Sequence, residues 1–288
     1  MIARTLKATL FGVASFFVLA PTLTRASSPK KNLETYPETI QKARNLILQK
    51  NRPQALDVLV AALKNEKSNS IGFRELKKNI QEISRIFFTE KAQQVYEFSL
   101  SLKRADLAQA LTKINEALRL EPENFTLLLE AARQNLIKSD CKTALELAQK
   151  TQIINPWDNE LNLILAQAKM CQNDLPGYAS IKEGAVISGS IPWLSLEIER
   201  YLLEKNFTKA TDALAQLKKI DKNYPEQYYW AWKIDIDQKI NNLDSAQEYK
   251  SNCQNLTVTF YRRFLLDPRL CGRMVEVENF IKNQPANP

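Results

Sequence analysis

The chain repeats one apolar pattern at a step of 34 residues. Segment 110–122 reads ALTKINEALRLEP and segment 144–156 reads ALELAQKTQIINP, so both open on Ala-Leu and close on a proline. Recurrence with a period of about 20 to 50 residues is the signature of repeat proteins. Each repeat is one small unit of secondary structure that buries its apolar face against its neighbours. The pattern therefore constrains much of the chain to a stack of similar units.

The repeated unit is predicted to be a pair of helices. The whole chain has only six glycines, and they stand far apart, which disfavours sheet-rich folds with many tight turns. Two antiparallel helices joined by a short turn approach to about 8 Å only where the side chains at their crossing are small. Ala110 and Ala144 supply such side chains at the same position of successive units.

These residues resemble the tetratricopeptide repeat, whose pattern has small residues in both helices and a closing proline. The match is clearest over 124–156, where Ala132 stands at the small position of the first helix and Ala144 at that of the second. Pro156 closes this unit, while Thr151 stands where alanine is usual. The resemblance implies an all-α solenoid of antiparallel helix hairpins.

The resemblance covers most of residues 36–254, with departures from the family pattern. The unit at 157–190 is degenerate because Tyr178 stands where alanine is expected, directly after Pro176 and Gly177. The predicted segments are a signal peptide at 1–26, repeat-like units at 36–67, 89–122, 123–156, 157–190, 191–224 and 225–254, an extra helix at 68–88, and a C-terminal capping region and tail at 255–288.

The extra helix is predicted from its own periodicity. Leu76, Ile80, Ile83 and Phe87 recur at steps of three and four residues, which places them on one face of a helix packed on the core. The alanines Ala55 and Ala110 are 55 residues apart, so one unit and a 21-residue insertion separate them.

The N-terminus has the layout of a secretory signal peptide. Arg4 and Lys7 precede a 13-residue apolar run at 8–20, and the small-residue site Thr24-Arg25-Ala26 follows. A spanning helix needs about 20 apolar residues, so retention as a membrane anchor is the weaker alternative. We expect an exported protein, periplasmic or secreted, that is not inserted in a membrane after cleavage.

The charge of the chain is mildly basic. Removing the signal peptide takes away three basic residues and no acidic one, which lowers the net charge from +8 to +5. Lysine and glutamate alternate along the rest of the chain, so no basic stripe marks a nucleic-acid interface. We expect no nucleic-acid partner.

Four cysteines in an exported chain favour a disulfide framework. In the register of the resemblance, Cys141 begins the second helix of one unit and Cys171 ends the first helix of the next, so these ends are expected to be neighbours. Cys253 and Cys271 then form the other pair by elimination, provided that the backbone between them bends. The alternative is four reduced, buried cysteines.

The sequence lacks the residue types and motifs on which many classes of enzyme depend. The chain contains no histidine, which removes the usual base of nucleophilic triads and the usual ligand of catalytic zinc. It also lacks the clustered glycines of a nucleotide-binding loop. We expect no catalytic residues, no cofactor and no metal. Two alternatives remain: a glycan-cleaving enzyme that uses unmarked carboxylates, and a structural envelope component that associates with itself.

The predicted function is a scaffold or adaptor of the cell envelope that binds a peptide or protein segment. In the tetratricopeptide family, side chains of the first helix of each repeat line a concave groove. Those positions fall on Thr126, Leu129, Arg133, Leu136, Glu160, Leu163, Gln167, Met170, Glu199, Leu202, Tyr228 and Asp235. For each of them the alternative is a solvated helix face or a contact with the neighbouring repeat. The identity of the partner and the oligomeric state stay open.

An aromatic cluster lies beside the last of these positions. Residues 228–232 read YYWAW, and Trp230 stands at the packed position of its helix. Tyr228 and Trp232 are four residues apart, so they form either an exposed patch or part of the core under the cap.

Overall fold

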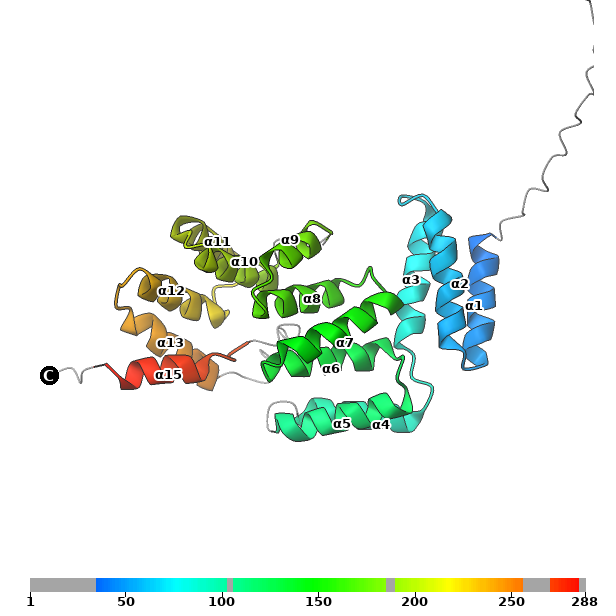
Figure 1. Cartoon of the computed structure of the whole chain (residues 1–288), viewed down its shortest axis with the longest axis horizontal. Helices are drawn as coiled ribbons and strands as arrows, with labels where there is room; N and C mark the ends of the chain where they lie inside the picture. The colour runs from blue at the N-terminus through cyan, green and yellow to red at the C-terminus, as the bar shows by residue number, and fades with distance from the viewer. Residues whose placement is uncertain (1–34, 103–105, 185–189, 256–269, 285–288) are drawn as a thin grey trace, which may run out of the picture. The chain divides into compact units, whose positions relative to one another are not determined.

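The protein is helical throughout the residues that the structure describes. The computed structural model describes residues 35–102, 106–184, 190–255 and 270–284, which lie in one compact unit, Thr35–Pro288. Fourteen α-helices and no strand occur in these ranges (Figure 1). The predicted signal peptide at 1–26 and most of the predicted capping region before residue 270 lie outside the described residues.

The helices follow one another with short connections. Their bounds are α1 Tyr36–Leu48, α2 Arg52–Asn65, α3 Ile71–Arg85, α4 Glu90–Leu102, α5 Leu107–Leu120, α6 Phe125–Ile137, α7 Cys141–Ile154, α8 Asn159–Cys171, α9 Leu175–Gly184, α10 Ile191–Leu203, α11 Phe207–Ile220, α12 Glu226–Asp237, α13 Leu243–Gln254 and α15 Met274–Lys282. Six hairpins result, α1/α2, α4/α5, α6/α7, α8/α9, α10/α11 and α12/α13, and the helices of each pack on each other. The all-α fold of antiparallel helix hairpins is confirmed.

Five hairpins share one turn geometry. The second residue after the first helix adopts a left-handed conformation, with φ between 55° and 66°, and the next amide N–H donates to the carbonyl five residues back. In α6/α7, for example, Ser139 is left-handed and the Asp140 N–H bonds to the Asn135 carbonyl at 2.9 Å. This is the Schellman motif, and it satisfies the last carbonyls of the first helix. The left-handed residues are Lys50, Ser139, Asn173, Lys205 and Lys239.

The second helix of most hairpins starts at a side-chain cap directly after this turn. The Asp140 carboxylate accepts the Thr143 N–H at 3.1 Å, and Asn206 caps α11 in the same way through the Lys209 N–H at 3.2 Å. Such caps satisfy amide groups that have no partner inside the helix. One left-handed residue and one capping residue therefore build each sharp reversal.

The alanines that define the repeat have no exposed surface. Ala132 in α6 and Ala144 in α7 lie in one core cluster, and the two helices pack directly on each other. Small side chains at these positions allow the close approach. The same full burial holds for Ala110, Ala132, Ala144, Ala166, Ala210 and Ala246.

Helix α6 contacts helices on both sides of it in the sequence, including the extra helix α3. Helix α3 packs on α1 and α2 and also contacts α6, while α5 of the next hairpin packs on α6 as well. Helices α7 and α8 contact α6 too, so every residue from Leu127 to Leu136 is buried. The extra helix is α3, in which Leu76 and Ile80 are fully buried and Ile83 is 4% exposed, as predicted. Phe87, the fourth residue of the predicted face, lies beyond the end of this helix and is half-buried.

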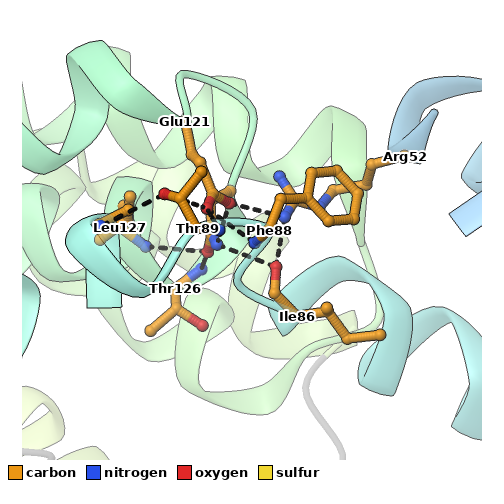
Figure 2. A network of polar contacts seen from close by, with 9 residues as sticks. Arg52, Ile86, Phe88, Thr89, Glu121, Thr126 and Leu127 are labelled. Atoms are coloured by element: carbon orange, nitrogen blue, oxygen red, sulfur yellow. Dashed lines mark hydrogen bonds and ion pairs between the residues drawn. The ribbon is translucent and has the colours of Figure 1, made fainter. Parts of the chain in front are cut away.

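A buried polar network joins the first helices of the chain to the α5–α6 turn (Figure 2). The Glu121 Oε1 atom accepts the backbone N–H groups of Phe88 and Thr89 at 2.7 and 2.9 Å. Its Oε2 atom accepts Arg52 Nη2 at 2.9 Å and Asn124 Nδ2 at 3.1 Å. Arg52 is 3% exposed and Glu121 is 5% exposed, so water hydrates neither charged group to any large extent.

The remaining contacts of Arg52 complete its coordination. Its guanidinium donates to the Ile86 carbonyl and lies 4.2 Å from the centre of the Phe88 ring. Burial by itself raises the pKa of Glu121, but the hydrogen bonds from Arg52, Asn124, Thr89 and Phe88 outweigh burial and hold that pKa below its ordinary value. The network therefore keeps the carboxylate ionised at neutral pH.

Two disulfides connect neighbouring elements. Cys141 at the start of α7 pairs with Cys171 at the end of α8, with a Cα–Cα distance of 5.8 Å. Cys253 in α13 pairs with Cys271, just before α15, at 5.6 Å. The first pair is the one expected from the repeat register, and the second is the one expected by elimination. Helix α15 packs on α13.

Candidate partner-binding surface

The first helices of the last four hairpins are neighbours. Helix α6 contacts α8, α8 contacts α10, and α10 contacts α12. We call α6, α8, α10 and α12 the helix-A row. All twelve residues predicted to bind a partner lie on these four helices. The predicted binding residues therefore all belong to the helix-A row.

On α6 the predicted residues lie mostly inside the protein. Thr126 is half-buried, but Leu129 and Leu136 are 2% and 5% exposed and belong to the core cluster between α6, α7 and α8. Arg133 is 7% exposed. Leu129 and Leu136 thus take the alternative role of contacts between neighbouring repeats.

Arg133 is the centre of an ion network across α3, α6 and α8. Its guanidinium pairs with Glu130 on its own helix and with Glu160 on α8. Glu160 also lies 3.4 Å from Arg85 Nη2, and Arg85 pairs with Asp158 at 2.8 Å. Burial by itself lowers the pKa of Arg133, but the charges of Glu130 and Glu160 outweigh it and raise that pKa.

On α8 three of the four predicted residues are buried. Leu163 and Met170 are 5% and 2% exposed and pack with Tyr178 and Trp193, and Gln167 is 2% exposed. Only Glu160 keeps partial exposure, with 21% of its side chain accessible.

The residue that makes the 157–190 unit look degenerate has a structural role. Tyr178 is fully buried in α9, and its hydroxyl donates to the Glu197 carboxylate on α10. Glu197 also pairs with Lys182 at 2.7 Å and Arg200 at 3.1 Å. The larger side chain therefore reaches a neighbouring repeat that alanine cannot reach, which sequence reasoning missed.

Helix α10 carries one buried and one partly exposed residue of the prediction. Leu202 is 9% exposed and lies in the C-terminal core cluster. Glu199 has 24% of its side chain exposed and lies 3.8 Å from Arg273 Nη2, which precedes α15. The prediction did not include Arg273.

Helix α12 carries the last two predicted residues. Tyr228 is half-buried against the C-terminal core cluster, and Asp235 is half-buried and accepts Asn242 Nδ2 at 2.6 Å. Trp230 and Trp232 are 2% and 3% exposed, and the Trp232 ring lies 5.2 Å from the Phe280 ring of α15. The suggestion that Trp232 forms an exposed patch is wrong, because α15 covers it.

The accessible part of the helix-A row is smaller than the predicted set. Five side chains keep partial exposure: Thr126, Glu160, Glu199, Tyr228 and Asp235. The other seven contact neighbouring helices or ion partners inside the protein. Whether a partner touches any of the twelve stays a prediction.

Two further ionisable groups lie on α4 and α12, Tyr96 and Glu226. Burial, with the negative charge of Glu130 adding to it, raises the pKa of Tyr96 to about 12, so this phenol stays protonated at neutral pH. Glu226 lies beside the sulfur atoms of Cys253 and Cys271, a spacing that suits a metal ion. Because those two sulfurs are joined in a disulfide, they do not provide thiolate ligands.

The chain was compared with known families, curated proteins and solved structures. No protein-family model matches it, and no curated protein matches it significantly. Among solved structures it is similar to a tetratricopeptide repeat protein from Parabacteroides merdae ATCC 43184. The sequence identity is 13%, the match covers 86% of this chain and 98% of that chain, and the TM-score is 0.45.

The fold rests on the chain's own geometry. Helix hairpins with one shared turn, fully buried alanines and first helices that contact one another are the features of the repeat. The chain has a tetratricopeptide-repeat-like fold.

Proposed function

We propose that the protein is a non-enzymatic scaffold or adaptor of the cell envelope that binds a peptide or protein segment on the helix-A row. The observation that carries this proposal is the alignment of four neighbouring helices, each of which keeps at least one partly exposed side chain at a predicted position. These are Thr126 on α6, Glu160 on α8, Glu199 on α10, and Tyr228 and Asp235 on α12.

The chemistry of these side chains favours a mixed contact. Tyrosine is a common anchor at protein interfaces because its ring is apolar and its hydroxyl can bond. Three of the five side chains are carboxylates. Glu160 and Glu199 lie beside arginines of the chain, so Asp235 is the one that most favours a basic residue in the partner. An extended or helical peptide along the row would meet one accessible side chain per repeat.

The disulfides support an extracytoplasmic location. Disulfide bonds form and persist in oxidising compartments, and both cysteine pairs of the chain are joined. The layout of the first 26 residues supports export. In the described part of the chain, no helix has the length and apolar character needed to cross a membrane.

Site-specific photocrosslinking in living cells tests the proposal. A photoreactive amino acid is placed at Thr126 or Tyr228, because both side chains are partly exposed and uncharged. Leu163 is a poorer position because it is buried. We expect the same envelope protein to be captured from both positions, since α6 and α12 belong to one row.

The matched controls lie on the second helices of two hairpins. Gln149 on α7 and Ala215 on α11 are exposed, so a probe there samples the second helices and is more accessible than a probe at Thr126 or Tyr228. Capture of one protein from Thr126 and Tyr228 but not from Gln149 and Ala215 would support the proposal. Equal capture from all four positions, or capture from the controls alone, would contradict it.

A further inference from the structure

Arg273 fills an acidic and aromatic site at the C-terminal end of the helix-A row. Its Nη1 atom lies 2.9 Å from Glu226 Oε2, and its Nη2 atom lies 3.8 Å from Glu199 Oε2. Its Cζ atom lies 4.6 Å from the ring centres of both Tyr229 and Trp230. Two carboxylates and two aromatic rings from α10 and α12 thus surround one guanidinium group.

This arrangement suits arginine better than lysine. A guanidinium group is flat, so its edges can pair with carboxylates while its faces stack on rings. An ammonium group is a compact charge that lacks the flat faces. The site therefore distinguishes the two basic side chains by shape rather than by charge.

The groups of the site are held by other contacts, independently of the guanidinium. Glu226 Oε1 accepts the Cys271 N–H at 2.6 Å and the Tyr249 hydroxyl at 3.1 Å, which leaves Oε2 turned to Arg273. The Tyr229 hydroxyl donates to Glu276 at 2.9 Å. The Tyr249 contact from α13 stays when the C-terminal segment is displaced and orients the Glu226 carboxylate in advance, whereas the Cys271 and Glu276 contacts leave with that segment.

The ligand of this site comes from the chain itself. Arg273 stands two residues after Cys271, which a disulfide ties to Cys253 in α13. A ligand tethered in this way has a high effective concentration, so a free competitor is excluded while the tether holds. The site borders the proposed partner surface, since Glu199 belongs to both.

We propose that Glu199, Glu226, Tyr229 and Trp230 form an arginine-binding site, which Arg273 fills within the chain and which an arginine of a partner protein fills when the C-terminal segment is displaced. This inference rests on the proposed function and specifies one chemical feature of the partner, an exposed arginine. Opening of the Cys253–Cys271 disulfide favours displacement, because it removes the tether.

Peptide binding to Arg273→Ala tests the inference directly. The variant removes the internal ligand and keeps the four site residues, and far-ultraviolet circular dichroism reports whether it folds. The probes are two fluorescently labelled, end-capped tripeptides, Gly-Arg-Gly and Gly-Lys-Gly, followed by fluorescence anisotropy. We expect the arginine peptide to bind the variant at least tenfold more tightly than the lysine peptide, and neither peptide to bind the oxidised wild-type protein.

Arg200→Ala is the matched control. Arg200 also pairs with two carboxylates, Glu197 and Glu204, and its Cζ atom lies 4.1 Å from the centre of the Tyr201 ring. Because Glu204 is exposed, the vacated position is open to water, and we expect no selective binding of the arginine peptide there.

A second variant covers the case in which Arg273→Ala does not fold. The double substitution Cys253→Ser and Cys271→Ser keeps Arg273 but removes its tether, and Cys141→Ser with Cys171→Ser is its control. We expect the arginine peptide to bind the Cys253→Ser, Cys271→Ser variant at least tenfold more tightly than the Cys141→Ser, Cys171→Ser variant. Equal binding of the two peptides, or equal binding to the two folded disulfide variants, would overturn the inference.

The peptide measurements are independent of the crosslinking experiment. A crosslinked partner together with no preference for arginine would reject the arginine site and leave the proposed function in place. Selective arginine binding together with no crosslinked partner would keep the site and reject the proposed function.

Discussion

The substitution Glu121→Gln should be among the most damaging conservative changes in the protein. It keeps the shape of the side chain but replaces one of its two acceptor oxygens by an NH2 group. Either orientation of the amide sets that group against donors: Arg52 and Asn124 on one side, or the N–H groups of Phe88 and Thr89 on the other. The Arg52 guanidinium also loses its charged partner while it stays buried.

The magnitude follows from the loss of a buried charge partner. Removing one member of a buried ion pair costs about 3 to 5 kcal/mol of unfolding free energy, because the other charge is left without compensation. Glu116 provides the control. It lies on α5, the helix that ends directly before Glu121, but pairs with Lys113 in a solvent-accessible position, where water screens the ion pair and leaves it little effect on stability.

Urea denaturation followed by circular dichroism at 222 nm compares the two variants with the wild-type protein. We expect Glu121→Gln to lower the unfolding free energy by about 3 to 5 kcal/mol and Glu116→Gln to leave it nearly unchanged. A loss below about 1 kcal/mol for Glu121→Gln would refute the argument that this carboxylate compensates the buried guanidinium.

The pH dependence of the same variant gives a second readout. The pKa of Glu121 lies below its ordinary value in the folded protein, so its ionised form stabilises the fold above the pKa of the unfolded chain. That contribution is lost as the pH falls through the folded pKa. The difference between wild-type and Glu121→Gln should therefore be largest near neutral pH and shrink in acid.

Three further experiments test the fold. Replacing Cys141 and Cys171 by serine opens a loop with a sequence separation of 30, so chain entropy predicts a loss of about 3.5 kcal/mol in urea denaturation; a loss below about 1 kcal/mol would contradict it. Lys205 has a φ of 55°, so Lys205→Gly should stabilise by about 0.5 to 1 kcal/mol, whereas Lys218→Gly inside α11 should destabilise by about 1 kcal/mol; equal effects would argue against strain at the turn. Ala144→Leu should cost about 1 to 3 kcal/mol or more by overpacking, while Ala215→Leu on the exposed face of α11 should change stability by less than about 0.5 kcal/mol; a neutral Ala144→Leu would show that the crossing tolerates a large side chain.

Much of the fold follows from local signals in the sequence. The alanine spacing fixes where helices cross, because a large side chain would keep the helices of a hairpin apart. The turns have a readable chemistry: Lys50-Asn51, Ser139-Asp140 and Lys205-Asn206 each place a left-handed residue before a helix-capping residue. Both signals act within a few residues, so they survive where the rest of the repeat pattern is degenerate.

The candidate surface was less predictable because exposure depends on neighbouring helices. The family register shows which side of a helix faces inward, but it does not show whether another helix covers that side. Leu129 and Leu163 lie at groove positions of the register and are nevertheless buried by adjacent repeats.

Long-range ion pairs were not predictable from spacing. Arg52 meets Glu121 across 69 residues, and Arg273 meets Glu226 across 47 residues. No periodicity links such residues, since each pair depends on how separate repeats stack. A buried arginine leaves no local sequence signal of its partner, and only the three-dimensional arrangement identifies it.

Hydrogen–deuterium exchange of the complex with the crosslinked partner tests the central claim most directly, because it reports which helices the partner covers. Partner binding should slow amide exchange in α6, α8, α10 and α12 and leave the exchange in α7 and α11 unchanged. Protection concentrated in α7 and α11, or no change in the helix-A row, would contradict the claim that this row holds the partner.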